Sequence, residues 1–114
     1  RAILIPHRSR HFHPDLVHAA DAVVAKLGYS TVAEVAQAGI RLGYVPRPRF
    51  PEGPELERWV REHLACRRIE AEALVSGAWL DTLGELLAMP PRLSQPDGAD
   101  PAAEQILAQL STNA

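Results

Sequence analysis

The chain alternates short apolar runs with stretches in which apolar residues recur at helical spacing. Four apolar runs stand out, at residues 3–5, 22–26, 40–45 and, more weakly, 65–69. Within each run the apolar residues are continuous rather than alternating with polar ones, which is typical of parallel strands covered by helices on both faces. We therefore expect four buried strands.

Helical patterns separate these runs, at residues 14–20, 31–38 and 54–64. In the third of them Leu56, Trp59 and Val60 recur at the spacing of one helix face. A parallel crossover needs a helix of about this length to return the chain. The alternation predicts an α/β fold, a Rossmann-like parallel sheet with flanking helices.

The pattern changes after the fourth run. Two helical stretches, 70–76 and 79–89, precede a segment rich in Pro, Ser, Asp and Gly, and a last helix at 102–110 carries its apolar residues on one face. We expect an α/β domain over 1–89, a linker over 90–101, and a C-terminal helix with a polar tail over 102–114.

Composition limits the size and the class of this protein. Of 114 residues, 46% are hydrophobic and 23% charged, which fits one modest globular domain. The net charge of -2 gives no global reason to bind nucleic acid or an anionic membrane. No apolar run approaches the ~20 residues that span a bilayer. We expect a soluble cytoplasmic protein without an integral membrane segment, which does not bind nucleic acid.

Two further features concern the state of the chain. Cys66 is the single cysteine, which excludes an internal disulfide and indicates a buried, inert thiol in a strand. The chain begins at Arg1 and enters an apolar run almost at once. We therefore expect a fragment of a longer protein, whose exposed sheet edge and apolar patches favour self-association.

Cations gather on the loops that follow the predicted strands, although the net charge is negative. In open parallel sheets, ligands bind at the carboxyl ends of the strands, where these loops converge. Arg10 lies on the first such loop and Arg47 on the third. This edge should attract an anion.

The loop after the second run has the most distinctive pattern. Gly28 permits a tight turn, and Ser30 or Thr31 can cap the helix that contains Glu34, with capping-box spacing from Thr31 to Glu34. A helix N-terminus also presents free N–H groups that suit a phosphate. The spacing alone leaves both roles open.

Residues 20–35, which read ADAVVAKLGYSTVAEV, resemble the donor-binding motif of GT-B glycosyltransferases, and 38–40 and 44–47 continue the match. The chain is similar to peptidoglycan-precursor N-acetylglucosaminyltransferases and to the glycosyltransferase-like amino-terminal region of some L-arabinokinases. The second likeness is closer at 26–29, at Arg47 with Phe50, and at 76–79. The resemblance covers residues 3–87 and implies a partial C-terminal half of a GT-B fold.

The resemblance implies particular site residues. The diphosphate contacts fall on Gly28, Ser30 and Thr31, and the ribose contact falls on Glu34. The loop that ends at Phe12 and His13 would lie against the nucleobase. Arg10, Arg47 and Glu52 are further candidates for phosphate or sugar contacts.

The resemblance also implies a function, which is transfer of a sugar from a UDP-sugar or another nucleoside-diphosphate sugar to an acceptor. The catalytic base and acceptor pocket would belong to an N-terminal domain outside this chain. We expect no cofactor and no metal, since the chain has no Asp-x-Asp sequence. Many relatives grip the donor sugar with an Asp-Gln or Glu-Asn pair after the proline, but residues 49–55 read RFPEGPE, which leaves the sugar open.

Three alternatives accompany this hypothesis. The chain could be a catalytically silent nucleotide-sugar-binding or interaction module, because a fold does not fix a function. Residues 29–45 superficially resemble a DNA-binding helix-turn-helix. Trp59 and Trp79 could be sugar-stacking platforms, although their apolar helix faces favour a place in the core.

Overall fold

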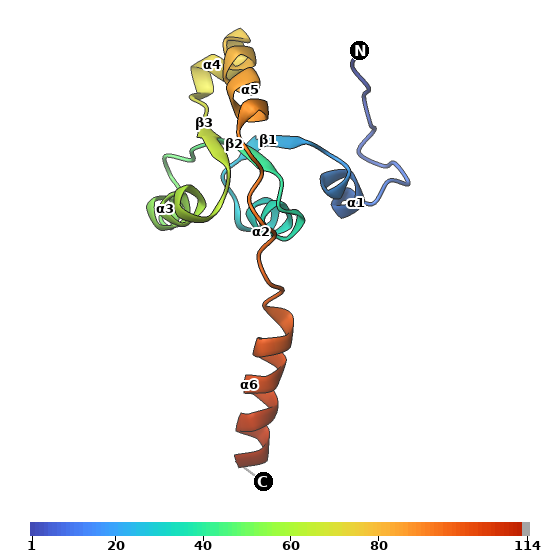
Figure 1. The fold of residues 1–114 in the computed structure, drawn as a ribbon, viewed down its shortest axis with the longest axis vertical. Coiled ribbons are helices and arrows are strands. Elements are labelled where there is room, and N and C mark those ends of the chain that lie inside the picture. The colour runs from blue at the N-terminus through green and yellow to red at the C-terminus, as the bar shows by residue number, and fades with distance from the viewer. Residues whose placement is uncertain (113–114) are drawn as a thin grey trace.

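A three-stranded parallel sheet organises the chain in the computed structural model, which describes residues 1–112. Its strands are β1 (Ala22–Lys26), β2 (Arg41–Val45) and β3 (Cys66–Arg68), hydrogen-bonded in the order β1-β2-β3 (Figure 1). Helices flank this sheet on both faces. The predicted α/β, Rossmann-like architecture is confirmed.

Two crossover helices lie on one face of the sheet (Figure 1). Helix α2 (Tyr29–Ala38) connects β1 to β2, and α3 (Gly53–His63) connects β2 to β3. Both match the predicted helices at 31–38 and 54–64 to within two residues. A shorter helix, α1 (His13–His18), precedes β1 and packs against α2.

The main core lies between the sheet and this helix pair. Leu42 and Tyr44 of β2 point into it, and Val35 of α2 and Val60 of α3 are fully buried there. Burying an aliphatic side chain of this size contributes roughly 1.5–3 kcal/mol. The buried face of β2 is therefore the centre of the fold.

Helix α5 (Trp79–Ala88) covers the opposite face of the sheet, and the short α4 (Ala71–Ser76) precedes it (Figure 1). Leu86 of α5 is fully buried against the sheet. A Cβ added at Gly43 would lie 2.9 Å from Cδ1 of Ile69 and 3.5 Å from Cδ2 of Leu86. The glycine in β2 therefore lets α5 approach closely.

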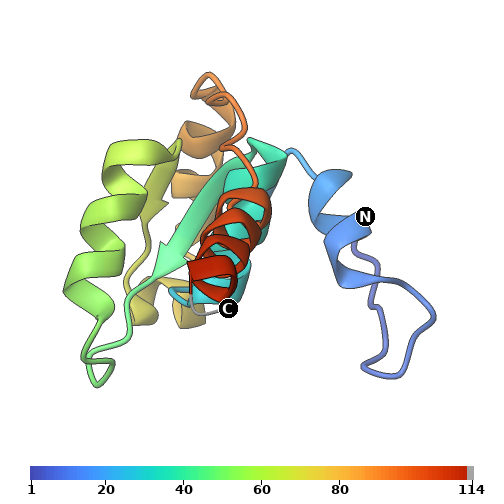
Figure 2. The same cartoon turned by 90° about the horizontal axis from the view of Figure 1, so that it is seen from below.

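The predicted strand at residues 3–5 is wrong. This segment is irregular, and Ile3, Leu4 and Ile5 are 76%, 94% and 44% exposed. A strand needs a partner for its backbone hydrogen bonds, but helix α1 carries the N-terminal segment away from the sheet (Figure 2). An apolar run without a neighbouring edge to pair with does not become a strand.

The C-terminal helix α6 (Ala99–Thr112) begins earlier than the predicted 102–110 and stands apart from the rest of the molecule (Figure 1). Its first turn is capped by Asp97, whose Oδ1 accepts a hydrogen bond of 2.9 Å from the amide of Ala99. Ile106, Leu107 and Leu110 are each about 60% exposed. The predicted polar tail at 111–114 is wrong for its first two residues, which continue α6 to Thr112, and residues 113–114 lie outside the described residues.

The segment before α6 is not a free linker. The amide of Gln95 donates to the carbonyl of Ala36 at 2.9 Å, and Nε of Arg41 donates to the carbonyl of Met89 at 2.7 Å. Gly39 has a φ of 69° and sits so close to this segment that a Cβ would meet the Arg92 carbonyl at 2.9 Å. Residues 89–95 are thus bound along the amino end of the sheet.

The packing of α5 can be tested with two adjacent leucines. Leu86→Ala removes a fully buried side chain and should lower the free energy of unfolding by about 2–5 kcal/mol. Leu87→Ala, at a side chain that is 44% exposed, should cost less than about 1 kcal/mol. Urea denaturation of both variants measures the difference, and equal losses would contradict the described orientation of α5.

Candidate functional site

The parallel register brings the loops after all three strands to one edge of the sheet. The amide of Leu27 donates to the carbonyl of Val45 at 2.8 Å, and the amide of Ile69 donates to the carbonyl of Tyr44 at 2.8 Å. The segments that follow β1, β2 and β3 therefore start side by side. This carboxyl edge is where sheets of this class bind ligands.

Helix α2 begins at this edge with no side-chain cap. Gly28 is its N-cap in an extended conformation, and neither Ser30 nor Thr31 caps it. The predicted capping box is wrong, because the helix begins at Tyr29 and so places both hydroxyl residues inside its first turn. The first-turn amides of α2 are left without a side-chain acceptor among residues 1–112.

Glu34 contacts His13 and does not form the capping box with Thr31 that the sequence spacing suggests. Its Oε2 lies 2.8 Å from Nδ1 of His13, which is 21 positions earlier in the chain. The packing of α1 on α2 makes this contact possible. Phe12, at the start of α1, is 66% exposed beside it. The structure thus brings together the residues that the resemblance assigns to the ribose and to the nucleobase.

The loop after β2 packs onto the start of α2. The guanidinium of Arg47 lies 4.6 Å from the centroid of the Phe50 ring, in cation–π geometry. The Phe50 ring in turn meets the ring of Tyr29 edge-to-face, with centroids 5.8 Å apart. These contacts hold Arg47 near the α2 N-terminus, beside a hollow of about 560 Å³ that Arg49 and Arg68 also line.

Two candidates remain apart from this group. The side chains of Arg10 and Glu52 are exposed and make no hydrogen bond or ion pair within residues 1–112. Trp59 is half-buried against the core, as expected, and stacks on His63 with centroids 4.5 Å apart. Trp79 is half-buried at the start of α5.

Sequence reasoning missed a polar network beside the same edge. The hydroxyl of Tyr44 donates to Oε1 of Glu57 at 2.8 Å. Arg68 donates to that oxygen at 2.8 Å and to the carboxylate of Glu70 at 2.6 Å. The members come from β2, α3, β3 and the turn after β3, and no spacing along the sequence signals that they meet.

The network changes the acidity of its members. Burial raises the pKa of Tyr44 well above its ordinary value, and the bond to Glu57 adds to this. Burial opposes ionisation of Glu57, but the hydrogen bonds from Tyr44 and Arg68 outweigh it and lower the pKa of this carboxyl. Glu57 is therefore a stable carboxylate that orients its neighbours.

Cys66 is half-buried and donates to the carbonyl of Val60 at 3.7 Å. Burial raises the pKa of its thiol, which agrees with the expected inert role. Within residues 1–112 no group of three or more His, Cys, Asp or Glu side chains could hold a metal ion. In the same range no helix is long and apolar enough to cross a membrane.

The network can be tested by stability measurements. Tyr44→Phe removes one hydrogen bond and should cost about 1 kcal/mol. Glu57→Ala should cost more, about 1–3 kcal/mol, because it leaves the buried Tyr44 hydroxyl without a partner. Glu72→Ala, at an exposed position of α4, is the control and should change stability by less than about 0.5 kcal/mol. A smaller loss for Glu57→Ala than for Tyr44→Phe would contradict this assignment.

The same carboxyl gives a pH dependence. Since the pKa of Glu57 is lower in the folded protein, its contribution to stability is complete above the ordinary value of 4.5 and is lost as the pH falls through the folded value. Glu57→Gln should therefore lose less stability than the wild type on acidification below about pH 4.5. Thermal unfolding of both proteins across this range checks the expectation, and parallel curves would refute it.

Comparison with known proteins gave no matching family model, no matching curated sequence and no matching solved structure.

Proposed function

We propose that this chain is the donor-binding part of a GT-B-like glycosyltransferase and holds a nucleoside-diphosphate sugar at the carboxyl edge of its sheet. The contact between His13 and Glu34 carries the proposal. The resemblance assigned these residues separately, to the nucleobase and to the ribose, which are joined in every nucleotide. Their contact beside the α2 N-terminus supports a single nucleotide site.

The start of α2 suits the diphosphate. Its first-turn amides have no side-chain cap, and the hydroxyls of Ser30 and Thr31 belong to the same turn. Free N–H groups and the helix dipole favour a phosphate there. No atom lies within 4 Å of the position that a Cβ would take at Gly28, so a ligand can approach the backbone. Arg47 supplies a positive charge from the adjacent loop.

The nucleoside would extend from this turn toward α1. The carboxylate of Glu34 can accept two hydrogen bonds from a vicinal diol, which is the ribose. His13 holds that carboxylate and is itself 68% exposed, so it can also contact the ligand. The exposed ring of Phe12 offers an apolar face to a base.

In this proposal the chain stabilises the leaving group. Transfer of the sugar to an acceptor leaves negative charge on the nucleoside diphosphate, and amides and arginines fixed in advance stabilise it. An acceptor-binding domain outside this chain would supply the general base. The donor is a UDP-sugar or another nucleoside-diphosphate sugar, and the single free cysteine fits a cytoplasmic setting.

The second candidate is a catalytically silent nucleotide-sugar-binding module. Residues 49–55 lack the Asp-Gln or Glu-Asn pair that holds the donor sugar in many proteins of the family that the chain resembles. The helix-turn-helix interpretation of residues 29–45 is wrong, because residues 41–45 form strand β2 in the middle of the sheet.

Calorimetric titration of UDP and other nucleoside diphosphates tests the site. Ser30→Ala and Glu34→Ala should each weaken binding roughly tenfold, equivalent to about 1.4 kcal/mol. Gly28→Ala should also weaken it while leaving stability unchanged, because the fold has room for the methyl group. Glu72→Ala is the matched control and should bind as the wild type does. Absence of nucleotide binding by the wild type would refute the proposal.

A turnover assay separates the two candidates. The longer protein that we expect to contain this chain should release nucleoside diphosphate from its donor when an acceptor is present. Glu34→Ala should reduce that release, because it removes the ribose contact. Nucleotide binding without any release would instead identify a silent module.

A further inference from the structure

A second concave surface lies along the outer side of β3, and arginines dominate its lining. This hollow of about 520 Å³ is formed by α3, β3 and the segment after α5. We call it the arginine hollow. Its charged lining residues are Arg61 of α3, Arg67 and Arg68 of β3, Arg92, and the carboxylate of Glu57.

Four guanidinium groups and one carboxylate line the arginine hollow, and Arg67 also pairs with Glu85 of α5 at 3.5 Å. Glu57 is already engaged by Tyr44 and Arg68. Arg92 donates to the uncharged backbone carbonyl of Glu62. Within residues 1–112 the side chain of Arg61 has no ion pair. Arg61 and Arg92 are therefore the two guanidinium groups of the hollow that no carboxylate within residues 1–112 pairs with.

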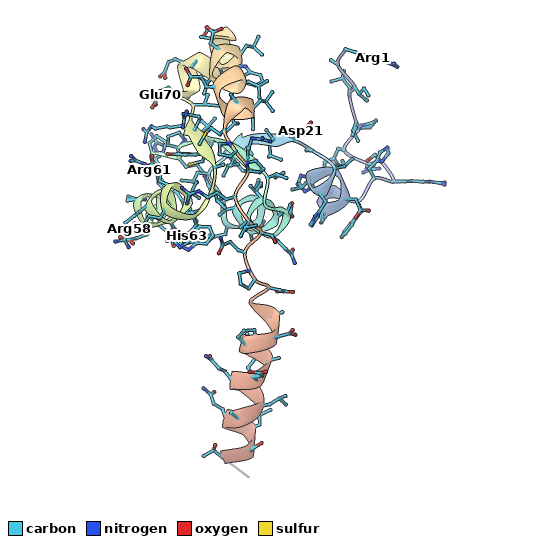
Figure 3. The ribbon with its side chains drawn as sticks, viewed as in Figure 1. Arg1, Asp21, Arg58, Arg61, His63 and Glu70 are labelled. Atoms are coloured by element: carbon cyan, nitrogen blue, oxygen red, sulfur yellow. The ribbon has the colours of Figure 1, made fainter. Side chains whose placement is uncertain are left out.

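Some of these cations are held in place before any ligand arrives. Arg68 is fixed between Glu57 and Glu70. Arg92 belongs to the segment 89–95, which the bonds from Arg41 and Gln95 anchor to the amino end of the sheet. Arg61 lines the arginine hollow from α3, and Figure 3 shows it at the outer margin of the molecule. Such fixed positions reduce the entropy lost on binding.

We propose that the arginine hollow binds a small molecule that carries a phosphate group. Planar guanidinium groups bind phosphate oxygens in pairs, which suits a cluster of arginines better than it suits lysines. The volume lies within the roughly 300–1,000 Å³ of small-molecule sites. This favours a small ligand over a polymer.

The arginine hollow shares Glu57 and Arg68 with the hollow beside Arg47, but Ser30, Glu34 and His13 do not line it. It lies beside β3 and α3, whereas His13 and Glu34 lie on α1 and α2, where they contact each other. The proposal does not rest on the glycosyltransferase hypothesis. Arg61→Ala and Arg92→Ala test the arginine hollow by itself, because neither residue lines the hollow beside Arg47.

Cys66 provides a local signal, because it lines the arginine hollow and is the only cysteine. Burial raises the pKa of its thiol, and the charges of Arg92, Arg61 and Arg67 oppose that effect. A bound phosphate would neutralise these charges and raise the thiol pKa further. It would also cover the sulfur, so alkylation of Cys66 should become slower.

Pyrophosphate is the probe, with sodium chloride at matched ionic strength as the reference. We expect pyrophosphate to slow the reaction of Cys66 with iodoacetamide at pH 8 in a saturable way, by roughly tenfold for each unit that the thiol pKa rises. Arg61→Ala and Arg92→Ala should remove this protection. Arg8→Ala, outside the hollow, and Glu34→Ala, in the nucleotide site, should keep it.

Equal slowing by sodium chloride, or protection that survives in Arg61→Ala and Arg92→Ala, would overturn the proposal. Calorimetric titration of pyrophosphate measures binding without using the thiol. The Ser30→Ala variant, in which the nucleotide site is weakened, is compared with the double variant Ser30→Ala/Arg61→Ala. Binding lost only in the double variant supports the arginine hollow. Equal binding by both variants, or binding by neither, refutes it.

Discussion

The parallel pairing of β1 with β2, in which Lys26 lies opposite Val45, is the constraint on which the other features depend. Parallel pairing requires a crossover, and α2 supplies it. The crossover sets the start of α2 at the carboxyl edge and its end at the amino edge. The N-terminus of α2 can then face a ligand. The segment that follows α5 packs against its C-terminus, where the amide of Gln95 donates to the carbonyl of Ala36.

Both candidate sites follow from where this sheet ends on either side. Beyond β1, α1 packs against α2 and brings His13 to Glu34. Beyond β3 no further strand follows within residues 1–112, and Arg67 pairs with Glu85 of α5 while Arg68 pairs with Glu57 of α3. Arg61 and Arg92 lie beside this strand without an ion pair among residues 1–112. Such local fields govern which ligands approach each side.

The two layers around the sheet differ in how tightly they are held. The face toward α2 and α3 has a continuous core around Val35 and Val60. The opposite face depends on α5, with Leu86 seated over Gly43. Helix α6 has no partner among residues 1–112 and keeps its apolar stripe exposed. Stability therefore rests on the sheet and its crossovers rather than on the C-terminal helix.

The sequence alone determined the secondary structure of the central region, because apolar runs and helical periodicity follow directly from the order of side-chain types. It therefore predicted the strands at 22–26, 40–45 and 65–69. The expected burial is wrong for β3, in which Arg67 and Arg68 are exposed. Local pattern could not show whether a strand edge would lie beside residues 3–5. It also could not show that Glu34 contacts His13 instead of forming a capping box with Thr31. The network of Tyr44, Glu57 and Arg68 was likewise decided by tertiary structure, since its contacts join elements whose proximity depends on the sheet register and on helix packing.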